Sequence, residues 1–132
     1  MKNKIVYFLL FIGLLTSCST DDEKNTAVAS DLNGTWEMTS YVAFLPDLPE
    51  INSNEIKWTF DIDANQLSIV NTIEAAYPYI LASGNYSNLL ITANTITIAG
   101  IEYDYTIENE ILIISDDPES DGPIMRFISD QN

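Results

Sequence analysis

The sequence contains no histidine, and this absence removes several kinds of catalytic and metal site. Without histidine there is no Ser-His or Cys-His nucleophile pair and no imidazole ligand for zinc. The five glycines are scattered and form no glycine-rich loop that would hold phosphate groups. Pairs of carboxylates, which support glycoside hydrolysis, arise by chance in so acidic a chain. We therefore expect a protein that is not an enzyme and that carries no cofactor.

Basic residues are also scarce, because Lys and Arg number 5 against 20 for Asp and Glu, which gives a net charge of −15. A chain this acidic is repelled by phosphate backbones and by anionic lipid surfaces. We therefore expect no nucleic-acid partner. Any attachment to a membrane has to come from a covalent lipid, and the acidity itself serves solubility.

Cysteine occurs once, at Cys18, so no intramolecular disulfide can form. Two lysines, Lys2 and Lys4, precede an uncharged apolar run over Ile5–Leu15. This run has the length of the apolar part of an export signal, and it is shorter than the ~20 residues that a membrane-spanning helix needs. The N-terminal segment is therefore predicted to direct export.

The end of this segment, Leu15-Thr16-Ser17-Cys18, resembles the lipobox of bacterial lipoproteins. The resemblance implies that residues 1–17 are a signal peptide and that Cys18 becomes a lipidated N-terminus. It places the protein on the outer membrane, facing the periplasm or the cell surface, with the membrane as a partner through the lipid. The alternatives are an ordinary signal cleaved near Ser17, or an uncleaved anchor. Cleavage leaves three cations and a net charge of −17.

Residues 18–30 have low hydrophobicity and little periodicity after the cysteine, which is typical of a flexible acidic tether. Twelve residues of coil reach roughly 20 Å. The cluster Asp21-Asp22-Glu23 resembles signals that send some lipoproteins to the outer face of the outer membrane. The remaining residues, 31–132, are predicted to form one domain.

That domain has a hydrophobic period of two, which indicates β-strands. In Glu55–Asp63 the residues Ile56, Trp58, Phe60 and Ile62 share one face, and polar residues share the other. We expect further strands at 36–44, 67–73, 95–99, 101–108, 111–114 and 124–128, with short pieces near Tyr79 and at 89–91. Consecutive short strands favour an all-β antiparallel up-and-down meander of about eight strands, closed into a small barrel. An open meander or a sandwich is the alternative.

Particular features of these strands carry further expectations. Asp63–Gln66 and Glu108–Glu110 are predicted hairpin turns. Ile111–Ile114 is apolar on both faces, as a covered strand would be. Tyr103 and Tyr105 share the apolar face of their strand, so we expect both in the core.

The segment Leu32–Trp36 contains the Gly-x-Trp that opens the first strand of lipocalins, and Arg126-Phe127 lies in the last strand. Over roughly residues 31–129 the chain resembles the lipocalin-like domains of bacterial lipoproteins. The resemblance implies a barrel in which the first and last strands are neighbours and Arg126 stacks on the ring of Trp36. The alternative for Arg126 is a pair with a nearby carboxylate. The chain is shorter than ordinary lipocalins, and side chains can fill a small barrel.

Three tyrosines flank a loop-like stretch at 82–85 and could rim an opening: Tyr77, Tyr79 and Tyr86. An aromatic rim with apolar walls suits a small-molecule pocket, whereas ordinary packing near a sheet edge is the alternative. We expect the domain to bind a small apolar or amphipathic ligand. The other reading is a structural or protein-interaction module of the envelope that holds no ligand.

A calcium-responsive surface protein is a third possibility, because four carboxylates precede Gly122 within a short loop. These candidate metal ligands are Asp116, Asp117, Glu119 and Asp121. The loop lacks a distal bidentate glutamate and contains Pro118, so a solvated turn between two strands is the alternative.

Overall fold

The computed structural model describes residues 29–45, 47–74 and 80–130. The described chain is an all-β fold, as the hydrophobic period predicts. Its elements are η1 (Ala29–Leu32), β1 (Gly34–Val42), β2 (Ile56–Asp61), β3 (Gln66–Asn71), β4 (Gly84–Ser87), β5 (Leu90–Ile91), β6 (Thr95–Ile98), β7 (Ile101–Glu108), β8 (Ile111–Ser115), η2 (Pro118–Ser120) and β9 (Ile124–Ser129). No helix in these ranges has the length and apolar character needed to cross a bilayer.

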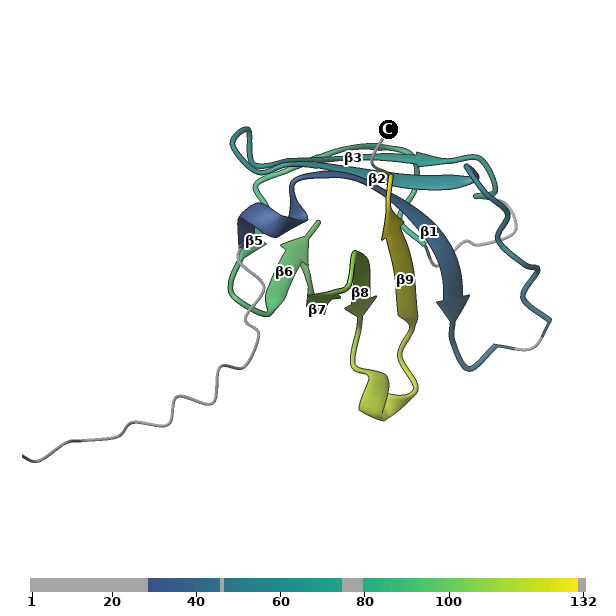
Figure 1. The fold of residues 1–132 in the computed structure, drawn as a ribbon. Coiled ribbons are helices and arrows are strands. Elements are labelled where there is room, and N and C mark those ends of the chain that lie inside the picture. Colours follow the sequence, from purple (N-terminus) through teal and green to yellow (C-terminus); the bar gives the residue numbers. More distant parts are fainter. Residues whose placement is uncertain (1–28, 46, 75–79, 131–132) are drawn as a thin grey trace, which may run out of the picture.

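The strands form one antiparallel sheet in the order β4-β3-β2-β1-β9-β8-β7-β6-β5. Consecutive strands therefore pair, except β4 and β5, and the first strand also pairs with the last. The sheet curls into a half-barrel, with β2 and β3 on one side and β6 to β9 on the other, joined by the long, curved β1 (Figure 1). This confirms the predicted up-and-down meander and the predicted contact between first and last strands.

The two edges of the sheet are consecutive in the chain. Only Asn88 and Leu89 separate β4 from β5. All ladders are antiparallel, so β4 and β5 run in the same direction. The segment 84–91 therefore runs from one edge to the other, with β4 paired to β3 and β5 paired to β6. The nine strands agree with the predicted meander of about eight.

A bulge in β1 allows this strand to belong to both sides of the half-barrel. The register to β9 shifts between Met38 and Ser40, so Thr39 is extra. Before the bulge Trp36 and Met38 point inward, and after it Tyr41 does. One inserted residue thus changes the phase of the alternation, and the strand bends there.

The inner face of the half-barrel is filled by side chains. Trp58, Phe127 and Leu112 are completely buried, and the Trp58 and Phe127 rings lie 5.0 Å apart between centroids at a tilt of 52°. Tyr103 and Tyr105 are also buried, which confirms their predicted core position. Tilted aromatic pairs at this distance are favourable beyond the area that they bury.

One end of the half-barrel is closed by the segment that precedes β1. Leu32, the last residue of η1, is completely buried, and its carbonyl oxygen accepts a hydrogen bond of 2.8 Å from Trp36 Nε1. The Gly34-Thr35-Trp36 segment therefore has a clear local role here. The Trp36 side chain both fills the core and holds the chain that covers this end.

The predicted hairpin turns are confirmed. In the first, Asp61 Oδ1 accepts from Ala64 N at 2.9 Å, and Asn65 has a φ of 53°. In the second, Asn109 and Glu110 both have positive φ, as a two-residue type I′ hairpin turn requires.

Two strand predictions were wrong. β4 falls on residues expected to be a loop, because Tyr86 is its only large apolar side chain and no alternation marks it. β8 is not covered on both faces, since Ile111 is 39% exposed and Ile113 only half-buried. The outer face of β8 is open to solvent, although Ile111 and Ile113 on this face are apolar.

Candidate ligand-binding site

Of the three tyrosines predicted to rim an opening, Tyr77 and Tyr79 lie outside the described residues. Tyr86 is half-buried on β4, and its hydroxyl donates to the carbonyl oxygen of Ala82 at 2.8 Å. Tyr86 belongs to a tyrosine group, Tyr41, Tyr86 and Tyr103, that the sequence analysis did not identify. Tyr103 on β7 lies near enough to Tyr86 and to Tyr41 on β1 to interact with both electrostatically.

Tyr103 is the centre of this tyrosine group. Burial first, and then the negative charges of Asp116, Tyr41 and Tyr86, together raise the pKa of Tyr103 to about 12. Burial also raises the pKa of Tyr105, with a contribution from Asp31 in η1. Tyr103 therefore lies among other tyrosines and has an acidic neighbour, Asp116.

The Tyr103 hydroxyl makes stability depend on pH in the alkaline range. Its pKa is about 12 when folded and 10 when unfolded, so above pH 10 the unfolded chain loses this proton first. Stability therefore falls as pH rises from 10 to about 12. Denaturant unfolding across this range should show a shallower decline for Tyr103→Phe than for the parent. Equal slopes would contradict the assignment.

A groove lies beside β1 where its pairing with β2 stops. β1 pairs with β2 only from Gly34 to Glu37, while its pairing with β9 continues to Val42. Leu48–Ile51, in the connection from β1 to β2, lies across this stretch of β1. Glu37 is buried and accepts from Asn54 N at 2.8 Å, so it fastens the end of that connection to β1.

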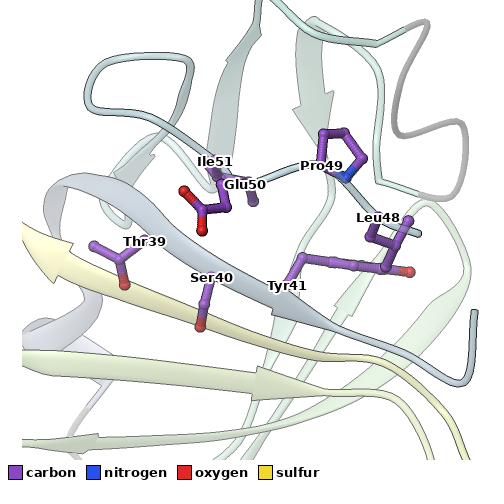
Figure 2. Close-up of a pocket in the computed structure, with 7 residues that line it drawn as sticks. All are labelled: Thr39, Ser40, Tyr41, Leu48, Pro49, Glu50 and Ile51. Carbon is purple, nitrogen blue, oxygen red and sulfur yellow. The ribbon is translucent and has the colours of Figure 1, made fainter. Parts of the chain in front are cut away.

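The groove has a volume of about 460 Å³. Its lining comes from β1 and from the connection: Thr39, Ser40, Tyr41, Leu48, Pro49, Glu50 and Ile51. In Figure 2 Leu48 lies next to Tyr41, whereas Glu50 directs its carboxylate toward the side of Thr39 and Ser40. The groove thus has an apolar end at Leu48 and Tyr41, and at the other end the Glu50 carboxylate lies beside Ile51. Small-molecule sites have volumes of about 300 to 1,000 Å³, and this groove falls within that range.

Tyr41 connects the groove to the tyrosine group. Its side chain is only 8% exposed and lines the groove, and it interacts electrostatically with Tyr103. The bulge at Thr39 is what turns Tyr41 inward, because without it the alternation would place this side chain on the outer face.

Two donors in the core have no hydrogen-bond partner within the described part of the chain, Trp58 Nε1 and Asn71 Nδ2. Asn71 lies opposite Ile56 on the inner face, and its Oδ1 accepts from Ile73 N at 3.0 Å. A buried donor left unpaired costs about 1–3 kcal/mol. The largely apolar interior therefore contains two polar N–H groups without a hydrogen-bond acceptor.

The predicted calcium loop is a compact turn between β8 and β9. The carbonyl oxygen of Asp117 accepts from Ser120 N at 3.0 Å and from Gly122 N at 3.1 Å. A Cβ on Gly122 would lie 1.6 Å from the carbonyl oxygen of Asp116, so only glycine fits here. Within residues 29–45, 47–74 and 80–130, no three acidic or cysteine side chains gather as a metal ion requires. Asp117, Glu119 and Asp121 are exposed in this turn, whereas Asp116 is half-buried. The calcium site stays a prediction.

The predicted stacking of Arg126 on Trp36 is wrong. Arg126 is exposed and lies between the buried residues Met125 and Phe127, so it points to the outer face of β9. Trp36 is buried on the inner face. Since successive side chains of a strand point to opposite faces, these two cannot stack. The strands do pair as expected, with Trp36 opposite Ser129 and Arg126 opposite Ser40.

Comparison of the chain with protein-family profiles, with curated proteins and with solved structures gave no match.

Proposed function

We propose that this protein is a lipid-anchored lipoprotein of the cell envelope whose lipocalin-like domain binds a small amphipathic ligand. The observation that carries the ligand proposal is the groove of about 460 Å³ between β1 and Leu48–Ile51. Its size suits a small molecule, and its lining offers apolar side chains beside hydroxyl and carboxylate groups. An amphipathic molecule matches both parts, whereas a purely apolar one would leave Glu50 and Ser40 beside hydrocarbon.

The envelope part of the proposal rests on the N-terminal sequence. Leu15-Thr16-Ser17-Cys18 follows an apolar run of export-signal length. A lipid on Cys18 would attach the domain through a tether of roughly 20 Å. The outer membrane is the expected location, with the domain in the periplasm or at the cell surface.

Native mass spectrometry of the protein purified from its own envelope tests the ligand proposal. We expect a small molecule to accompany the parent protein. Thr39→Trp places a large ring in the groove from an exposed position, so this variant should lose the adduct. Thr106→Trp, at an exposed position on β7 outside the groove, is the matched control and should keep it. The proposal fails if the parent carries no adduct, or if both variants retain it.

A second candidate function is an interaction module that binds another envelope protein. The outer face and the end of β1 expose several large apolar side chains: Val42, Phe44, Ile111 and Ile128. Phe44 is 84% exposed and lines a smaller hollow of about 240 Å³ with Val42 and Ile124. Exposed apolar patches often mark protein contacts. In the same mass spectra, a bound protein in place of a small molecule would favour this function.

A further inference from the structure

We propose that the groove selects amphipathic ligands that carry a positively charged nitrogen, such as a quaternary ammonium or a protonated amine. This inference rests on the proposed ligand-binding function and names the chemical class of the ligand.

The charge lining the groove is negative. Glu50 directs its carboxylate toward Thr39 and Ser40, and none of the 7 lining residues is basic (Figure 2). Two hydroxyls at this end supply further oxygen atoms around the same space. A cationic head group at the Glu50 end would therefore meet oxygen atoms of the right polarity, whereas a carboxylate or phosphate there would face Glu50.

The other end of the groove is aromatic. The Tyr41 side chain lines it next to Leu48. These two side chains suit the hydrocarbon part of a ligand whose charged nitrogen lies at the Glu50 end. An organic cation that also carries an apolar chain therefore fits both ends of the groove.

Neither basic side chain of the described residues places a positive charge in the groove. Lys57 Nζ is engaged with Asp130 Oδ2 at 2.6 Å. Arg126 lies opposite Ser40 on β9, but its side chain is exposed on the outer face and does not line the groove. The whole chain carries a net charge of −15, and such a field raises the local concentration of cations and lowers that of anions.

The test compares three probes with the same ten-carbon chain, each below its micelle concentration: decyltrimethylammonium, decyldimethylamine N-oxide and decanoate. Isothermal titration calorimetry with the mature protein at low salt should give binding affinities that decrease in that order. We expect the ammonium to bind about five- to tenfold more tightly than the uncharged N-oxide. Added salt should weaken the binding of the ammonium probe only, because salt screens the attraction between its charge and the protein.

Two matched variants locate the selectivity. Glu50→Gln removes the groove's carboxylate at an exposed position, so ammonium binding should weaken about fivefold while N-oxide binding stays unchanged. Glu119→Gln, in the turn between β8 and β9, makes the same change in total charge outside the groove and should leave the ranking intact.

The possible results separate the two proposals. Equal binding of the three probes, tighter binding of decanoate, or an unchanged preference in Glu50→Gln would overturn the cation selectivity and leave the ligand-binding function standing. If none of the probes binds, both proposals fall. The ranked affinities, together with loss of the preference in Glu50→Gln alone, would establish the inference.

Discussion

Replacing Cys18 with Ala is expected to move the protein out of the membrane fraction, or to leave it as an unprocessed precursor. In the proposed lipoprotein the sulfur of Cys18 would carry the lipid, and no second cysteine in the chain can replace it. The mature domain is too acidic to bind an anionic lipid surface by charge. One acyl chain holds a protein only weakly and two or three hold it stably, so loss of the lipid should be close to all-or-none.

Ser17→Ala is the matched control, because it keeps a small residue before the cysteine and should be processed and anchored normally. Fractionation of cells, followed by mass measurement of the N-terminal peptide, distinguishes the outcomes. A Cys18→Ala protein that is still processed and still membrane-bound would show that the lipoprotein proposal is wrong.

Phe127→Ala should destabilise the domain by about 3–5 kcal/mol. The ring is completely buried, and it contacts Trp58 at 5.0 Å between centroids, across the inner face from β9 to β2. Its removal leaves a cavity where the first and last strands meet, and the surrounding strands cannot close it fully. Because the whole domain is expected to be stable by only about 5–15 kcal/mol, this loss should be large in a denaturant titration.

Ile128→Ala is the control for this prediction. Ile128 follows Phe127 in the same strand but is 45% exposed on the outer face. Its truncation should cost less than about 1 kcal/mol, the range over which strand propensities differ. If the two variants lose similar stability, the assignment of inner and outer faces on β9 is incorrect.

The strand pattern could be predicted from the sequence because alternation is a local property. Ile56, Trp58 and Phe60 alternate with polar residues, and all three are buried as expected. The ends of hairpins were also readable, since Asn65 and Asn109 suit positive φ. The strand β4 was missed because its residues, Gly84 to Ser87, are mostly small and polar and pair with β3 through the backbone.

The groove could not be predicted, because it depends on where pairing between two strands stops. Nothing in Glu37 itself shows that β1 leaves β2 after this residue. The sequence did contain one signal, since Thr39 and Ser40 interrupt the alternation between Met38 and Tyr41, and this marks the bulge. Leu48 and Ile51, apolar residues in a connection that also contains Pro49, were a second signal.

The failure of the Arg126 prediction has the same origin. The resemblance to lipocalins concerned residue types near the two chain ends, and Trp36 and Arg126 do lie on paired strands. Their contact, however, depends on the face that each side chain takes. Met125 and Phe127 are the buried residues of β9, so Arg126 between them has to point outward.

The most direct test of the central claim is a nuclear magnetic resonance titration of the isotope-labelled mature protein with decyltrimethylammonium. The account predicts saturable shifts of the backbone amides of Thr39, Ser40 and Tyr41, and of Leu48, Glu50 and Ile51 across the groove. Shifts confined to the outer face around Ile111 and Ile128, or no shifts at all, would contradict ligand binding at this site.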